Sequence, residues 1–330
     1  IIALITYCLA PIVSTQPSWF YVMVIVTVLL LTELKHTFTE FAQRMKNDEM
    51  ITLAKFLAIS GIILPMLPHK NLIPDINLTP YSIWLATVVV SGISYLSYLL
   101  KRYVFHESGT LVSGIIGGLY SSTATISVLA RKSRKASEQE ATEYVAAMLL
   151  AVSMMFLRFM ILILIFSREI FLSIYPYLLI MSVVSAIVGW FVHSRQKLPK
   201  DTSVESEEDD SSNPLEFKVA LIFAVLFVVF TVLTHYTLVY AGTSGLNLLS
   251  FVSGFSDITP FILNLLQNTG SVAVLIITAC SMQAIVSNIL VNMFYALFFA
   301  GKRSKLRPWI LGGFGAVIAC NLVLLLFFYL

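Results

Sequence analysis

The sequence predicts an all-α integral membrane protein, arranged as an inverted repeat of three spans plus one re-entrant helical hairpin per repeat. The composition is 58% hydrophobic and 12% charged, whereas soluble domains contain about one quarter charged residues. The apolar runs have the length of bilayer-crossing helices and lack the alternation of barrel strands. Two of these runs also have polar centres, which a helix surrounded by lipid does not tolerate well.

The two polar-centred runs are residues 109–130 and 245–266. In the first, Gly117 and Gly118 precede four hydroxyl residues within positions 121–125. Glycine exposes backbone, and Ser and Thr compete for backbone hydrogen bonds, so neither favours an uninterrupted helix. The second run has the central sequence Gly-Phe-Ser-Asp-Ile-Thr-Pro, and its Gly254 follows Gly118 by 136 residues. We expect the two centres to form two halves of one site.

The distribution of Lys and Arg indicates that both runs are re-entrant. If both crossed the membrane fully, the loops would carry eight cations on one side and ten on the other. If both return to the side from which they enter, the division becomes sixteen to two, which the positive-inside rule favours. The half-helices at 246–254 and 260–267 are about 12–14 Å long, so each reaches only the midplane of the bilayer.

Four regions follow along the chain. Residues 1–79 contain the N-terminal spans and an interfacial helix, and residues 80–192 form the first repeat. Residues 193–213 form an acidic cytoplasmic linker, and residues 214–330 form the second repeat. Because each repeat contains three spans, an odd number, the two repeats have opposite orientations.

Nine crossings are predicted in total. The amphipathic helix at 33–49 lies between the N-terminal spans, with its apolar residues at helical spacing on one face. The predicted spans are 1–13, 19–32, 50–68, 80–100, 141–166, 171–192, 214–240, 271–300 and 308–330.

Several segments resemble one known family. KFLAISGIILPMLP (55–68), GGLYSSTATISVLARKSR (117–134) and SGFSDITPFIL (253–263) resemble the MgtC/SapB-type bacterial membrane proteins that carry a C-terminal domain of unknown function. The resemblance implies a bacterial inner membrane protein, with the N-terminal region being the tail of the MgtC-like part. It also implies a link with magnesium. Members usually have Asp-x-Asp in the second hairpin, where this chain has Asp257 and Thr259.

The predicted ion pathway combines the two hairpin tips with polar residues of the following spans. Hydroxyls, freed carbonyls and one carboxylate are hard oxygen ligands for cations, and the candidate metal ligands are Asp257, Thr259 and Ser122. Half-helix N-termini after Ser122 and Thr259 favour anions instead. The pathway residues are Gly118, Ser121, Ser122, Thr123, Thr125, Gly254, Ser256, Asp257, Thr259, Arg158 and Asn288.

Two of these residues lie in the spans that follow the hairpins. Arg158 lies well inside a span, where a charge is costly and faces a partner or a cavity; Asp257 is its candidate partner, for a structural ion pair or a substrate role. Arg158 and Asn288 each lie seventeen residues past the predicted start of their span, which makes them rough positional equivalents.

The sequence contains no enzyme motif and implies no cofactor. There is no phosphate loop, nucleophile elbow or metal-binding His spacing, and the three cysteines have unrelated spacing. The basic run at 131–140 is an inner-side anchor and not a nucleic-acid patch. The expected partners are the lipid bilayer and a small inorganic ion, and assembly as a homo-oligomer is left open.

Three functions are compatible with these features. The first is an inner-membrane transporter or channel for a small inorganic cation, Mg²⁺ or monovalent, conducted past the paired hairpins. The second is an anion channel that uses the helix N-termini and Arg158. The third is a non-transporting regulator that binds another membrane complex through the 33–49 helix or the acidic linker.

Overall fold

The computed structural model is helical and forms two compact units, residues 1–56 and residues 57–330. Most of the predicted span at 1–13, the interfacial helix at 33–49 and the acidic linker lies outside the described residues. The structure describes residue 7 and residues 18–33, 47–73, 76–105, 109–136, 138–195, 217–267, 272–301 and 306–329.

Each of the N-terminal helices contains 16 residues or fewer. Helix α2 (Ser18–Glu33) coincides with the predicted span at 19–32 and contains 16 residues. The predicted span at 50–68 is a helical run but not one regular α-helix, because α4 (Asn47–Ala58) continues into a π-helical turn, η1 (Ile59–Ile63), and the short α5 (Leu64–Met66). Pro65 has no backbone N–H, so it cannot form the α-helical hydrogen bond to the carbonyl of Gly61 in η1. The regular α-helix is therefore interrupted at this point.

The second unit consists of long apolar helices. Seven helices in the described residues are long and apolar enough to cross a bilayer, so the chain is a multi-pass membrane protein, as predicted. Six of them coincide with the six spans predicted after residue 79, and the seventh, α7, contains the first polar-centred run. The seven helices are α6 (Pro80–Leu99), α7 (Thr110–Lys135), α8 (Glu138–Phe166), α9 (Arg168–Ser194), α10 (Phe217–Ser253), α12 (Val274–Ala300) and α13 (Leu306–Tyr329), and the shorter α11 (Ile258–Gln267) lies between α10 and α12 in the chain.

Local sequence explains where several of these helices begin. Thr79 and Ser82 form a capping box at the start of α6, with Pro80 at the first helical position, where its missing N–H costs nothing. Ser167 caps α9 by accepting a hydrogen bond from the Ile170 N–H at 3.4 Å.

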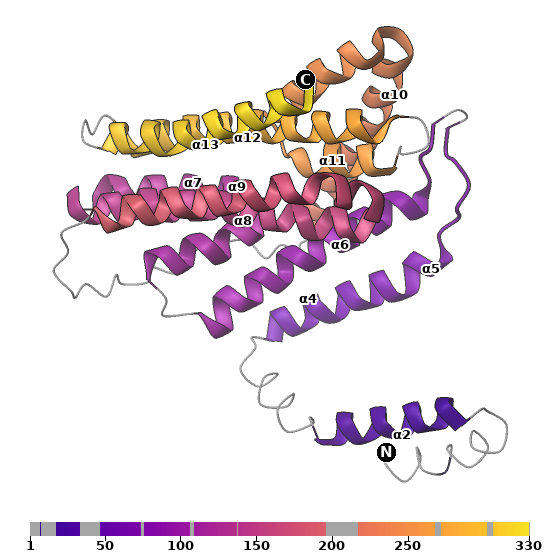
Figure 1. Ribbon diagram of the computed structural model, residues 1–330. Coiled ribbons are helices and arrows are strands. Elements are labelled where there is room, and N and C mark those ends of the chain that lie inside the picture. The colour runs from indigo at the N-terminus through magenta and orange to yellow at the C-terminus, as the bar shows by residue number, and fades with distance from the viewer. Residues whose placement is uncertain are drawn as a thin grey trace. The chain divides into compact units, whose positions relative to one another are not determined.

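Helix α12 occupies the centre of the second unit. It packs against α7, α10 and α13, while α7 and α9 pack against α8 (Figure 1). Of the most apolar stretch of α12, 72% is buried inside the protein, the largest share among the candidate spans. The polar side chains of α12 therefore face other helices.

Two of the long helices are interrupted. Gly242 breaks α10 with φ 58° and ψ −149°, a left-handed backbone conformation that glycine adopts without steric cost. Residues 217–241 and 243–253 are therefore two separate helical segments. Ser121 breaks α7 in an extended conformation with φ −158° and ψ 107°, which divides that helix into residues 110–120 and 122–135.

Candidate functional site

Helix α7 folds back on itself at Ser121. A methyl group placed on Gly117 would lie 2.5 Å from Oγ1 of Thr125. In a straight helix, residues eight positions apart are separated by about 12 Å along the axis. The two halves of α7 therefore lie against each other as a helical hairpin, and Gly117 is required because no side chain fits between them.

The first half of this hairpin runs parallel to α8 at very short distance. A methyl group on Gly114 would overlap the backbone of Ala147, and one on Gly118 would lie 2.6 Å from Cα of Ala151. Both pairs are 33 residues apart in sequence. Small residues allow such close approach of two helices, which is the usual basis of helix packing within a membrane.

The second polar-centred run also leaves the helical conformation at its centre. Segment 243–253 ends at a non-helical stretch, residues 254–257, and the chain continues as α11. Gly254 lies directly against Ser287 and the backbone of Asn288 in α12. Because Asn247 also accepts a hydrogen bond from the Cys280 thiol at 3.4 Å, segment 243–253 runs parallel to α12.

Side chains of α12 hold the second tip in place. The Ser287 hydroxyl donates to the carbonyl of Phe251 at 2.6 Å, and the Asn288 amide donates to the carbonyl of Gly254 at 3.3 Å. Asn288 also accepts a hydrogen bond from Asn292 at 3.1 Å. The bond to Gly254 satisfies a carbonyl just past the end of the helix. The bond to Phe251 adds to the one that this carbonyl accepts from the Gly254 N–H at 3.3 Å.

Each hairpin has a capped second half-helix. The Ser121 hydroxyl accepts a hydrogen bond from the Ala124 N–H at 3.3 Å. In the second hairpin, Oδ1 of Asp257 accepts from the Thr259 N–H at 2.9 Å. The prediction that Thr259 caps a helix starting at Pro260 was therefore wrong: the helix begins two residues earlier, because the Asp257 carboxylate is an equally good cap and proline is tolerated throughout the first turn.

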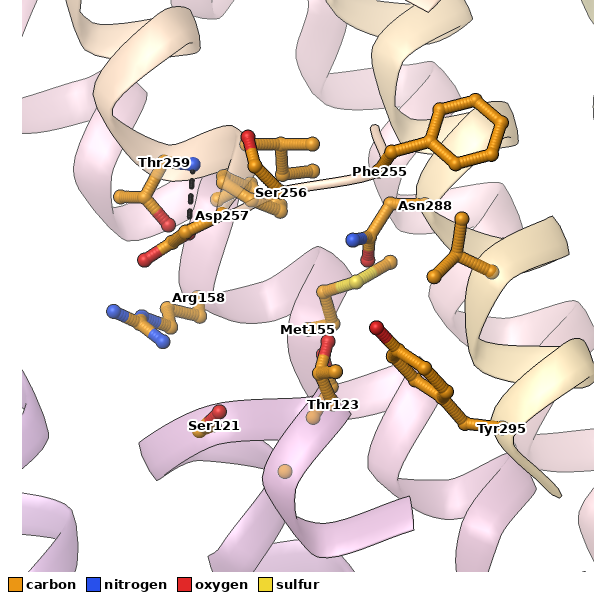
Figure 2. A pocket seen from close by; sticks show the side chains of 15 residues that line it. Ser121, Thr123, Met155, Arg158, Phe255, Ser256, Asp257, Thr259, Asn288 and Tyr295 are labelled. Atoms are coloured by element: carbon orange, nitrogen blue, oxygen red, sulfur yellow. Dashed lines mark hydrogen bonds between the residues drawn. The ribbon is translucent and has the colours of Figure 1, made fainter. Parts of the chain in front are cut away.

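The two tips meet at a cavity of about 250 Å³. Figure 2 shows side chains of the second tip on one side of this space and those of the first tip on the other. Nine of the eleven predicted pathway residues line it. Thr125 and Gly254 do not, because each is used in the helix contacts described above. The lining residues are Gly118, Ser121, Ser122, Thr123, Met155, Arg158, Phe159, Phe255, Ser256, Asp257, Ile258, Thr259, Asn288, Val291 and Tyr295.

Arg158 connects three elements at this cavity. Its Nη1 donates to the carbonyl of Tyr120 at 2.7 Å, and its Nη2 donates to the hydroxyl of Ser94 in α6 at 3.4 Å. The Asp257 carboxylate points toward the guanidinium and interacts with it electrostatically, without a hydrogen bond between them (Figure 2). Arg158 therefore anchors the first tip and faces the charge of the second.

The sequence prediction missed several lining residues. The most informative is Tyr295, whose hydroxyl points into the same space as Thr123 and Met155 (Figure 2). Tyr295 follows Asn288 by seven residues, two helical turns, so both side chains lie on one face of α12. That spacing was available in the sequence. Met155 and Phe159 lie close to Arg158 in the sequence of α8. Their apolar character gave no reason to predict them as pathway residues.

The cavity contains one carboxylate. No group of three His, Cys, Asp or Glu side chains suited to a metal ion occurs in the described residues. Of the candidate metal ligands, Asp257, Thr259 and Ser122 all line the cavity. A cation there would depend largely on hydroxyl oxygens, and its binding remains a prediction.

Comparison with known proteins identifies the family. The family model "Domain of unknown function (DUF4010)" matches residues 88–300, more than half of the chain. The chain belongs to the DUF4010 family. All fifteen cavity-lining residues lie inside the matched DUF4010 region.

One relative has also been found. An uncharacterized protein of Aquifex aeolicus (strain VF5) is 25% identical over 224 residues, which cover 67% of this chain and 96% of the relative. No solved structure matches the chain. The predicted domain of unknown function is thus confirmed as DUF4010. Neither match carries the MgtC/SapB name, so that part of the resemblance remains a prediction.

Proposed function

We propose that this DUF4010 protein moves a small inorganic ion across a bacterial inner membrane, past the tips of its two hairpins. The observation that carries the proposal is the cavity itself, which joins two polar tips from distant parts of the sequence with Arg158 and Asn288. Non-helical backbone at membrane depth is stable only where it is buried in protein or lines a water-filled space. In the proposed pathway the tips line such a space, and transporters commonly place their ion sites at such interrupted helices.

The contacts of the two hairpins support an inverted repeat. Gly118 packs on Ala151 and Gly254 packs on Ser287, and both pairs are 33 residues apart. Adding 136 to the first pair gives the second. The same shift converts Ser121 into Asp257, and these two residues cap the second half-helices.

This alignment replaces the one predicted from the ends of the spans. In the alignment predicted from the ends of the spans, Arg158 corresponded to Asn288. The glycine contacts instead pair Arg158 with Phe294 and Asn288 with Val152. The polar groups that α8 and α12 add to the cavity are therefore not equivalent, and the two halves of the pathway differ chemically.

The proposed topology makes both hairpins re-entrant and places the linker at 193–213 in the cytoplasm. Lys101 and Arg131 flank the first hairpin, so they lie on the same side of the membrane in this topology. Single cysteines at the two positions should react with a membrane-impermeant maleimide from the cytoplasmic side alone. Labelling of the two positions from opposite sides would exclude the inverted repeat.

Ion flux into liposomes tests the pathway. We expect the purified chain to carry an ion flux, and Ser122→Ala and Asp257→Asn to change its rate or its selectivity. Ser194→Ala is a matched control, because among the described residues this exposed hydroxyl in α9 bonds only to the carbonyl of Phe191. If both cavity variants behave like the wild type, these residues are not part of an ion site.

A further inference from the structure

We infer that the ion held between the two tips is an anion. This inference rests on the proposed ion pathway and adds the sign of the ion. The sequence favoured a cation because hydroxyls, carbonyls and a carboxylate gather at the tips. The structure shows which of these groups are already engaged within the protein, and that changes the balance.

Three carbonyl oxygens at or beside the tips are engaged by side-chain donors. The carbonyl of Tyr120 accepts from Arg158, that of Phe251 accepts from Ser287, and that of Gly254 accepts from Asn288. A cation must replace its hydration shell with several oxygen ligands, commonly carbonyls or carboxylates. At this cavity it would compete for the carbonyls with a guanidinium, a hydroxyl and an amide.

Three hydroxyls remain open to the cavity, beside the Asp257 carboxylate. Ser122 and Thr259 line the cavity and are 8% and 3% exposed, and neither hydroxyl bonds to any described residue. The same holds for the phenol hydroxyl of Tyr295 within the described part of the chain. A hydroxyl without an acceptor can donate its proton to an anion. Burying such a group without a partner is costly, so a bound ligand is expected to satisfy it.

The positions of two hydroxyls strengthen this inference. Ser122 and Thr259 lie in the first turn of the half-helices that Ser121 and Asp257 cap. The N-terminal turn of a helix carries a partial positive charge, which attracts negative ions. Both half-helices begin at the cavity, so two such turns face the same space.

The two full charges do not decide the sign by themselves. Arg158 and Asp257 are opposite in charge, and the Asp257 carboxylate points toward the Arg158 guanidinium (Figure 2). The decision falls to the hydrogen-bonding groups, and each open hydroxyl can donate its proton to an anion. In this arrangement Asp257 opposes anion entry and Arg158 favours it, which gives the two residues opposite expected effects.

Paired substitutions test the sign directly. For an anion, Asp257→Asn should raise the flux several-fold, because it removes the opposing charge while Asn still caps α11. Arg158→Gln should lower it about tenfold. For a cation both effects reverse. Tyr295→Phe should lower an anion flux by removing one donor, whereas Tyr240→Phe, which alters an exposed side chain of α10, should leave it unchanged.

The measurement is the reversal potential of the full chain in liposomes with a potassium chloride gradient. A potential near the chloride equilibrium value supports the inference. A potential near the potassium value overturns the sign but leaves the ion pathway intact. Absence of flux with chloride, nitrate, potassium and magnesium salts would overturn the proposed function.

Anomalous diffraction gives a readout that does not depend on transport. In crystals soaked in sodium bromide, we expect a bromide peak between Ser122, Thr259 and Tyr295, and no peak there in rubidium chloride. A rubidium peak without a bromide peak contradicts the inference even if no flux is seen. The two measurements together separate a wrong ion from a wrong function.

Discussion

The two hairpins pack in the same way but are held by different chemistry. In each, a glycine lies directly on the helix that follows the hairpin, Gly118 on α8 and Gly254 on α12. The first tip closes through one extended residue, Ser121, whereas the second uses four non-helical residues, 254–257. Backbone packing is therefore common to both, and the tips are where the halves diverge.

The anchors of the two tips differ in charge. Arg158 bonds to the carbonyl of Tyr120 in the first tip, while neutral side chains of α12 bond to the carbonyls of the second. The first tip has a neutral cap, Ser121, and the second has a charged one, Asp257. Each half thus contributes one full charge. In the first half the charge is Arg158 of the span α8, and in the second half it is Asp257 at the tip. Charged hydrogen bonds are roughly twice as strong as neutral ones, so the first tip should be the more strongly held.

Replacing Arg158 should produce the largest effect. Arg158→Met leaves the carbonyl of Tyr120 without its donor and Asp257 without an opposing charge, and we expect a loss of about 3 kcal/mol in stability. Thermal unfolding in detergent measures it. Arg131→Met is the matched control, because Arg131 lies on the ring of Phe299 at 4.6 Å, a contact worth about 0.5–1 kcal/mol at an exposed site. Equal effects of the two substitutions would show that Arg158 does not anchor the first tip.

Adding a methyl group at the first glycine contact should have the next largest effect. Gly118→Ala places Cβ against the backbone of Ala151, which cannot move aside without separating the two helices. We expect a loss of about 1–3 kcal/mol. Gly254→Ala meets the side chain of Ser287 and the backbone nitrogen of Asn288, so the double variant with Ser287→Gly should recover part of its loss.

The matched control for both glycines is in α13. A methyl group on Gly312 would meet no atom within 4 Å, so Gly312→Ala should not destabilise the protein and should favour the helix slightly. If Gly118→Ala melts at the same temperature as Gly312→Ala, the close contact between α7 and α8 is not required.

Removing a neutral anchor of the second tip should cost less. Ser287→Ala deletes the bond to the carbonyl of Phe251, and we expect about 1 kcal/mol. Ser281 is a suitable control on the same helix, because its buried hydroxyl has no hydrogen-bond partner among the described residues. Ser281→Ala should therefore be close to neutral in the same unfolding measurement. A larger loss at Ser281 than at Ser287 would contradict the assigned anchor.

Sequence reasoning predicted the meeting of the tips better than their internal geometry. Two adjacent glycines followed by hydroxyls, and Gly-x-Ser-Asp-x-Thr-Pro, are unsuitable for lipid contact, so their burial at one polar cavity could be expected. The placement of Arg158 opposite Asp257 follows from the cost of a charge inside a span. Both arguments depend only on which residue types a segment contains, and a single sequence gives that information completely.

Register could not be predicted in the same way. The ends of predicted segments are uncertain by about two to four residues each, and a combined offset of six residues was enough to align Arg158 with Asn288 instead of Phe294. The cap of α11 was misplaced for a similar reason: Asp257 and Thr259 are both good caps, and only the backbone path chooses between them. Contacts such as that of Gly118 on Ala151 show which residues of the two repeats correspond to each other. Such contacts are known only once the chain is seen folded.

Exchanging the two caps should barely change how the half-helices are capped, and it tests the comparison most sharply. Asp257→Ser gives the second tip the cap of the first, and Ser121→Asp does the reverse. Because Ser and Asp are nearly equivalent as caps, the change of cap should by itself alter stability by less than about 0.5 kcal/mol in each variant. Asp257→Ser also leaves Arg158 without its opposing charge. Their effects on ions should be opposite, since the first removes the only carboxylate among the cavity-lining residues and the second adds another. Reversal potentials in a potassium chloride gradient should shift toward chloride for Asp257→Ser and toward potassium for Ser121→Asp. If both variants shift in the same direction, the charge at the caps does not select the ion.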